Sequence, residues 1–273
     1  ASNYIGQCEN QKMKIPLFQV KWMKDGKRVV TSSNKGQLIV WDALNFDHFQ
    51  SCDVHRERVY AMAWTNYQKF LITGDKAGYI VYCDNIIDKK NMFKAHNDTC
   101  IKDISCSMSS AKFATCSDDG TARVFDFATS RQEMVFQEHN SEVNSVDWHP
   151  FQSLVVTGSK DHTIRIWDAR SASSRSIFQV QAHNSTVLQT RWNPINGIYL
   201  LTGSRDMKVK LFDIRCLRKS VNEFDSTDSQ ISARLAAGDR RIVAPFHEQT
   251  FASACQSSGI TFWHTDYGKL YEV

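Results

Sequence analysis

The stretch FATCSDDGTARVFDF, from Phe113 to Phe127, decides how this chain folds. A short apolar run meets the turn Ser117 to Gly120, and a second run with alternating apolar and polar residues follows. Turn-forming residues between two β-rich runs are typical of a β-hairpin. The second run ends in the aromatic-Asp pair Phe125-Asp126. One such hairpin is a weak signal, so the fold depends on whether it recurs.

The aromatic-Asp ending does recur, with a nearly constant period. Equivalent pairs begin at positions 41, 83, 125, 167, 212 and 263, at intervals of 42, 42, 42, 45 and 51 residues. A second landmark is a residue before a short turn, and it is occupied by Trp22, Trp64, Cys106, Trp148 and Trp192. A third is a histidine 28 or 29 residues before four of the endings, namely His55, His96, His139 and His183. Three landmarks with one period predict repeated copies of one β-rich unit.

This period and these residues resemble the WD-repeat family, whose units are the four-stranded blades of a β-propeller. The resemblance covers nearly all 273 residues and implies an all-β propeller with six recognisable blades. The ring is then either six-bladed, or it has a seventh blade that is incomplete in this chain. We expect one propeller domain over residues 1–273. Residues 1–14 are either a closing strand or a frayed tail. Residues 225–241 are a loop insertion in the sixth repeat, either a plain polar loop or a partner-docking segment.

In the WD-repeat family, each unit holds a buried set made of the upstream His, a middle-strand Ser or Thr, the turn Asp and the terminal Trp. The resemblance assigns this structural role to His96, Asp119, His139, Asp161, Trp167, His183 and Asp206. In the fourth repeat the hydroxyl is that of Thr157 or Ser159. The second repeat departs from the pattern, because Ala77 and Cys83 occupy the Asp and Trp positions.

The composition is that of an ordinary globular protein, with 42% hydrophobic and 23% charged residues. A net charge of +4 is too small to imply nucleic-acid binding by itself and does not forbid a local basic patch. None of the eight cysteines forms a Cys-x-x-Cys pair, so we expect core thiols in a reducing compartment. No apolar run is long enough to cross a membrane, so we expect no membrane partner.

Catalysis finds little support in the sequence. The histidines and turn aspartates recur at structural positions of the repeat, and the chain contains neither a helix-borne metal pair nor a Gly-rich phosphate loop. We therefore expect a non-enzymatic protein with no metal, no cofactor and no small-molecule substrate.

A closer resemblance lies in the residues of several short runs, which include positions outside the general repeat pattern. The chain is similar to the WD-repeat subunit of the eukaryotic cleavage and polyadenylation specificity factor. The matching runs, in the same order, are Met92 to His96, Lys112 to Thr121, Val146 to Pro150, Leu154 to Val156, Ser204 to Asp206, Lys210 to Arg215, Phe251 to Ser253 and Phe262 to His264.

That resemblance implies a nuclear scaffold in pre-mRNA 3′-end processing. The implied partners are a large multi-propeller subunit, a zinc-finger subunit and the A/U-rich polyadenylation hexamer. RNA recognition of this kind stacks splayed bases on aromatic rings and places Lys or Arg on phosphates. The matching positions here are Phe46, His48 and Phe49 after the first repeat, with Lys12 and Lys14 just before it.

Two alternatives stay open. The three rings at positions 46, 48 and 49 could pack between blades rather than stack on bases. The endings Trp167 to Arg170 and Phe212 to Arg215 resemble the Trp-Asp-x-Arg motif of substrate receptors in cullin-based ubiquitin ligases. A ligase receptor, or another generic WD-repeat scaffold, is therefore the rival function.

Overall fold

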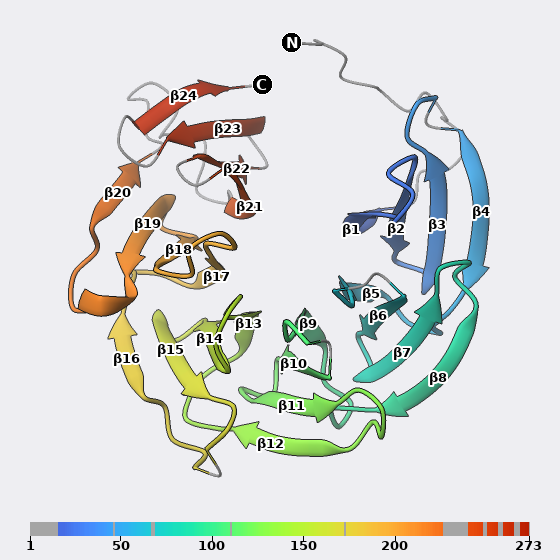
Figure 1. Cartoon of the computed structure of the whole chain (residues 1–273), viewed down its shortest axis with the longest axis horizontal. Coiled ribbons are helices and arrows are strands. Elements are labelled where there is room, and N and C mark those ends of the chain that lie inside the picture. Colours follow the sequence, from blue (N-terminus) through green and yellow to red (C-terminus); the bar gives the residue numbers. More distant parts are fainter. Residues whose placement is uncertain are drawn as a thin grey trace. The chain divides into compact units, whose positions relative to one another are not determined.

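The computed structural model is an all-β protein whose strands form six four-stranded antiparallel sheets (Figure 1). It describes residues 16–45, 47–66, 69–109, 111–171, 173–225, 240–247, 250–255, 259–264 and 268–272. We call each sheet a blade and number the blades in chain order. The predicted fold class, all-β with six WD-type propeller blades, is confirmed. The chain divides into two compact units between Ile104 and Ser105.

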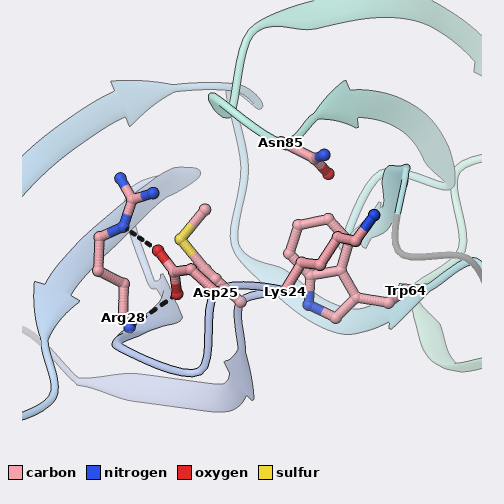
Figure 2. Close-up of a pocket in the computed structure, with 6 residues that line it drawn as sticks. Lys24, Asp25, Arg28, Trp64 and Asn85 are labelled. Carbon is pink, nitrogen blue, oxygen red and sulfur yellow. Dashed lines mark hydrogen bonds and ion pairs between the residues drawn. The ribbon is translucent and has the colours of Figure 1, made fainter.

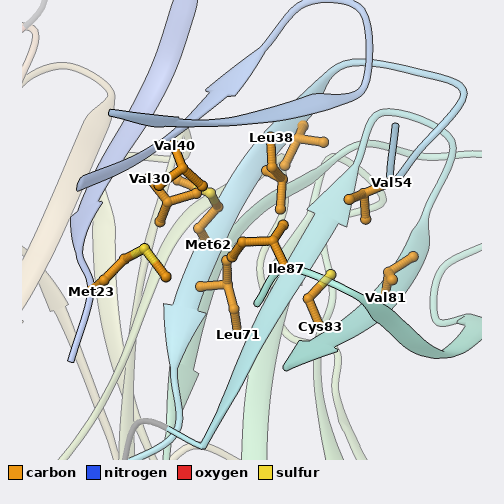
Figure 3. Close-up of a cluster of buried hydrophobic side chains, with 11 residues drawn as sticks. Met23, Val30, Leu38, Val40, Val54, Met62, Leu71, Val81, Cys83 and Ile87 are labelled. Carbon is orange, nitrogen blue, oxygen red and sulfur yellow. The ribbon is translucent and has the colours of Figure 1, made fainter. Parts of the chain in front are cut away.

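The first unit contains blades 1 and 2. Blade 1 consists of β1 (Leu17–Trp22), β2 (Arg28–Ser33), β3 (Gln37–Asp42) and β4 (His48–Asp53). Blade 2 consists of β5 (Val59–Trp64), β6 (Phe70–Asp75), β7 (Tyr79–Asp84) and β8 (Lys89–Lys94). Apolar side chains from both blades form one buried cluster, which includes Val30, Leu38, Met62, Leu71 and Val81 (Figure 3).

Blade 3 consists of β9 (Ile101–Cys106), β10 (Lys112–Ser117), β11 (Ala122–Asp126) and β12 (Gln132–Phe136), and the division between the units falls inside β9. Blade 4 consists of β13 (Val143–Trp148), β14 (Leu154–Ser159), β15 (Thr163–Asp168) and β16 (Phe178–Gln181).

Blade 5 consists of β17 (Val187–Trp192), β18 (Tyr199–Ser204), β19 (Lys208–Asp213) and β20 (Asn222–Asp225), with the 3-10 turn η1 (Ile214–Cys216) after β19. Blade 6 consists of β21 (Arg240–His247), β22 (Thr250–Cys255), β23 (Gly259–His264) and β24 (Gly268–Glu272).

The predicted hairpin at the centre of the repeat argument is β10–β11. Lys112 pairs with Asp126 and Cys116 pairs with Ala122, in the register that a short turn requires. Gly120 closes the turn at φ +78°, a backbone conformation that glycine adopts without steric cost. The rings of Phe113 and Phe125 stack with their centroids 5.4 Å apart. The aromatic at the end of the repeat therefore packs back onto the strand that precedes the turn.

The second strand of blades 1 to 5 is buried on both of its faces and has an apolar run in its first half. Five of the six residues of β14 are fully buried, and β6, β10 and β18 have the same pattern. Blades approach closely at glycines on these strands. A Cβ on Gly158 would lie 2.7 Å from Val187 Cγ1, and one on Gly74 would lie 2.8 Å from Ile101 Cγ2. Face-to-face packing thus explains the continuous apolar runs in the sequence.

Two predicted segments fall outside the described residues. Residues 1–14, expected as a closing strand or a tail, are not described, and neither are residues 226–239 of the predicted loop insertion. The strand β21 begins at Arg240, one residue before the predicted end of that loop. These segments and the single-domain boundary stay predictions.

Candidate functional site

The repeated histidine and aspartate residues form buried hydrogen-bonded sets inside the blades. In the fourth repeat, His139 Nδ1 lies 2.9 Å from Asp161 Oδ2, and His139 Nε2 lies 2.7 Å from Thr157 Oγ1. The indole N–H of Trp167 donates to the same Thr157 hydroxyl at 2.9 Å. Thr157 is therefore the hydroxyl of the set, whereas Ser159 Oγ donates to the Glu142 carbonyl at 2.8 Å.

The fifth repeat forms the same set without the indole. His183 Nδ1 lies 2.9 Å from Asp206 Oδ2, and its Nε2 lies 2.8 Å from Thr202 Oγ1. Burial alone would raise the pKa of Asp206, but the hydrogen bond and charge of His183 outweigh it and lower that pKa to about 2. Burial is likewise outweighed at Asp161, where His139 and Thr163 lower the pKa well below its ordinary value. The carboxylates stay ionised, which fits a structural role rather than proton transfer.

The second repeat has Ala77 at the usual Asp position, yet His55 has an acidic partner. In the structure Asp75 supplies it, with Oδ2 2.9 Å from His55 Nδ1. Asp75 lies two residues earlier, at the end of β6, where blades 1, 3, 4 and 5 have serine. Its other oxygen accepts from the backbone N–H groups of Ala77 and Tyr79. The Asp75 side chain therefore both binds the histidine and accepts the hydrogen bonds of the turn.

The first and third repeats are variants of the set. In blade 1 the Trp41 indole donates to Thr31 Oγ1 at 2.8 Å, as Trp167 does in blade 4. In blade 3 the Asp119 carboxylate accepts from Thr121 at 2.7 Å and pairs with Arg123 at 3.2 Å. His96 is fully buried.

The five residues predicted to contact RNA are only partly described. Lys12, Lys14 and Phe46 lie outside the described residues. His48 and Phe49 open the exposed strand β4, and the Phe49 side chain is 59% exposed. His48 packs edge-on against Trp41, with ring centroids 5.9 Å apart. Phe49 lies between two paired residues at an irregularity of the β3–β4 register and contacts the Arg28 guanidinium, 5.0 Å from its ring centroid.

Arg28 links Phe49 to a pocket that sequence reasoning missed. The pocket has a volume of about 400 Å³ and is lined by Met23, Lys24, Asp25, Arg28, Trp64 and Asn85. Figure 2 shows Asp25 and Arg28 joined on one side, with Trp64 and Asn85 on the other. Arg28 Nε lies 2.6 Å from Asp25 Oδ2. Slight burial would raise the Asp25 pKa, but hydrogen bonds from Lys27 and Arg28 lower it overall. We call Phe49 together with this pocket the Arg28 surface.

A comparison with the second unit explains why the pocket exists. Blades 1 and 4 have β1–β2 and β13–β14 loops of equal length, so Met23 corresponds to His149 and Asp25 to Phe151. Between blades 4 and 5, the His149 ring lies 4.9 Å from the Trp192 ring, and its Nε2 lies 3.0 Å from the Gly197 carbonyl. Between blades 1 and 2, Met23 and Asp25 replace these rings and leave the pocket over Trp64. In the sequence, the pocket corresponds to Met23 and Asp25 at the two positions where blade 4 has His149 and Phe151.

The Arg28 surface combines groups suited to an anionic ligand with flat rings. Lys24 and Arg28 provide positive charge, of which the Asp25 carboxylate balances one, while Phe49 and Trp64 provide aromatic area. Within the ranges that the structure describes, no three His, Cys, Asp or Glu side chains are placed to hold a metal ion. Nor is any helix there long and apolar enough to cross a membrane.

Comparison with known proteins agrees with this architecture. The family model described as "WD domain, G-beta repeat" matches residues 88–126, 130–168 and 174–213. Each match begins near the last strand of one blade and ends with the third strand of the next, so the sequence repeat is offset from the blade by one strand.

Several curated proteins are similar to most of the chain. A protein from Neurospora crassa named "Polyadenylation factor subunit 2" is 32% identical over 193 residues, which is 71% of this chain and 29% of that protein. Its namesake from Candida albicans is 32% identical over 77% of this chain and 38% of its own length. The human "WD repeat-containing protein 37" is 32% identical over 54% of this chain. The chain spans about a third of the length of the polyadenylation factor relatives.

Proposed function

Because this chain is a WD-repeat protein related to polyadenylation factor subunit 2, we propose that it is a scaffold subunit of the pre-mRNA 3′-end cleavage and polyadenylation machinery. In this role it binds other subunits and contributes to recognition of the polyadenylation-signal RNA. The observation that carries the proposal is the identity of about one third to relatives of that name from several fungi, over 71% to 77% of the chain.

The proposed role is non-catalytic and nuclear. The buried His-Asp sets hold strands and turns together, and their carboxylates have lowered pKa values, which supports a structural use of these residues. The proposed partners are a large multi-propeller subunit and a zinc-finger subunit of the polyadenylation specificity factor. Packed blades suit such docking, because their strands hold many connecting loops in place.

The Arg28 surface supports a share in RNA recognition. Arg28 contacts the exposed Phe49 ring and borders the pocket that contains Lys24 and Trp64. Aromatic rings that stack on splayed bases contribute roughly 1–3 kcal/mol per base. We extend the predicted RNA site, Lys12, Lys14, Phe46, His48 and Phe49, by Lys24, Arg28 and Trp64. The RNA proposed is an A/U-rich hexamer, bound together with the zinc-finger partner.

Affinity purification tests the scaffold role. A tagged full-length chain expressed in its own cells should recover subunits of the polyadenylation machinery rather than the adaptor of a cullin ligase. Recovery of a ligase adaptor without polyadenylation subunits would overturn the proposal.

An RNA titration tests the site. The assembly of this chain with the zinc-finger subunit should bind an A/U-rich hexamer more tightly than a scrambled one. Phe49→Ala and His48→Ala should reduce this discrimination, whereas Lys24→Ala should weaken both RNAs equally because a phosphate contact carries no sequence information. Ile86→Ala is the matched control, since Ile86 is an exposed residue beside Asn85 that does not line the pocket. If a variant that carries both Phe49→Ala and His48→Ala binds both RNAs like the wild type, the two rings serve only to pack blade 1.

The cullin-receptor alternative rests on the Trp-Asp-x-Arg endings. In both copies the arginine folds back on the aspartate of the same motif, with Arg170 Nη2 3.1 Å from Asp168 Oδ2 and Arg215 Nη2 2.6 Å from Asp213 Oδ2. These pairs close the turn after a strand. A local structural use of the motif is sufficient to explain it, so we favour the polyadenylation role.

A further inference from the structure

The strand β16 of blade 4 differs from the corresponding strands of the other blades. The last strand of each sheet is an edge, which leaves one row of backbone N–H and C=O groups outside the sheet. Natural proteins protect such edges with charged side chains. In the part of the chain that the structure describes, β16, with the sequence FQVQ, is the one last strand without a charged residue.

Exposed apolar side chains lie at the start of this unprotected edge. Ile177 is 49% exposed and Phe178 is 51% exposed. Val180, two residues further along, packs partly against the apolar cluster between blades 4 and 5, together with Ile214. The strand is therefore held firmly on the sheet while its outer part offers two large apolar groups.

A groove of about 650 Å³ runs beside this edge. One wall is β16, and the other is the segment Ile214 to Arg218 of blade 5. Arg215 is held by Asp213, whereas Arg218 is exposed and forms no ion pair with any described residue. Lys219 follows directly and is also exposed. The groove thus has a wall that is basic through Arg218, and this wall faces an uncharged strand edge.

We propose that β16 is the docking edge for an extended segment of a partner protein whose side chains alternate between apolar and acidic residues. The segment adds to blade 4 as a further strand. Its backbone pairs with the open row of β16. Because Ile177 and Phe178 are successive residues where the strand begins, their side chains point to opposite faces. The apolar side chains of the segment therefore cover Ile177 on one face, and its acidic side chains lie on the face of Phe178 and reach Arg218. In this mode of recognition, main-chain hydrogen bonds provide affinity and the contacts of alternate side chains provide specificity. The charge of the basic wall selects acidic residues over basic ones. This site is separate from the Arg28 surface and does not rest on the proposed RNA role.

A peptide selection on the full chain tests the proposal. A phage-displayed library of random linear peptides is selected on the immobilised protein, and enriched peptides are synthesised with a fluorescent label and titrated. We expect enriched sequences in which acidic and apolar residues alternate. Arg218→Glu should weaken their binding by about tenfold or more, because it places like charges opposite each other. Phe178→Glu should do the same by charging the edge.

Arg131→Glu is the matched control. Arg131 is exposed in the turn before β12 of blade 3, so this variant makes the same charge change away from the groove and should bind like the wild type. Thermal unfolding of each variant separates a folding defect from a binding defect. The proposal is overturned if no alternating acidic peptide is enriched, or if folded Arg218→Glu and Phe178→Glu variants bind such peptides unchanged. It is also overturned if Arg218→Glu reduces only RNA affinity or only self-association in light scattering, since RNA or a second copy would then be the occupant.

Discussion

At the scale of single residues, the Asp161 carboxylate accepts hydrogen bonds from several groups of its repeat. The sequence motif predicts only the contact with His139. The Oδ2 atom of Asp161 binds His139 and the Asn140 N–H, and its Oδ1 accepts from the N–H and the hydroxyl of Thr163. Asp161→Ala should therefore destabilise the protein by roughly 1–3 kcal/mol, because buried donors lose their acceptor. Chemical denaturation monitored by tryptophan fluorescence measures this change.

The control for Asp161→Ala is Lys160→Ala in the same turn. Lys160 is exposed and pairs with Glu142 at the surface, so its loss should stay within about 0.5 kcal/mol. Asp118, at the equivalent position in the turn of blade 3, is half-buried, so Asp118→Ala would be a poor control. Equal losses for the Asp161 and Lys160 variants would show that the buried set contributes little.

The same carboxylates make stability depend on acid pH. The pKa of Asp206 is lowered from its ordinary value of 3.8 to about 2 in the folded protein, so the unfolded chain binds the proton more tightly. The stabilisation is therefore complete above about pH 4 and is lost as the pH falls toward 2. We expect the thermal midpoint to decline over this window and to decline less in Asp206→Asn. A midpoint with the same acid dependence in both proteins would contradict this assignment.

At the scale of elements, polar side chains tie the first strands of successive blades together. Ser105 on β9 donates to Asp147 Oδ1 at 3.0 Å, and the backbone N–H of Trp192 on β17 donates to Asp147 Oδ2 at 2.8 Å. Ser105 in turn accepts from the Trp148 N–H on β13 at 3.0 Å. One carboxylate thus joins strands of blades 3, 4 and 5 through residues that all belong to the second unit.

Asp147→Ala should loosen this junction. We expect a loss of roughly 1–3 kcal/mol, since the Trp192 N–H and the Ser105 hydroxyl lose an acceptor. Amide hydrogen exchange should show faster exchange at Trp192. Glu133→Ala is the control, because Glu133 forms a surface ion pair with Lys112 that is worth at most about 1 kcal/mol. Unchanged protection at Trp192 in the Asp147 variant would mean that packing alone holds the blades.

At the scale of the whole molecule, the charge balance limits RNA binding. The net charge is +4, and the proposed surface contributes the cations Lys12, Lys14, Lys24 and Arg28. Each phosphate contact adds about 0.7 to the salt slope on a single strand. We therefore expect weak binding by the isolated chain, with a slope of at most about 3 in the plot of log affinity against log salt. Titrations over a range of salt concentrations measure it, and Lys24→Ala should reduce the slope by about 0.7. A much steeper slope would place the RNA on a different and larger basic surface.

The sequence by itself determined the fold of this protein, because the period of its landmarks is a property of local structure. Each hairpin turn, such as Ser117 to Gly120, is specified by nearby residues, and 42-residue spacing repeats the same local solution. His139, Asp161 and Trp167 were likewise readable from the sequence, since every blade needs buried partners for its polar groups.

Only the tertiary structure decided which groups meet across the repeat. The carboxylate of Asp75 reaches His55 from a position that the motif reserves for serine, because a side chain at the end of the strand points to the same buried space. The pocket over Trp64 and the groove beside β16 are formed by residues from two blades, far apart in sequence. Spacing within one repeat cannot reveal such sites, because the space between blades depends on what each of two repeats contributes to the junction.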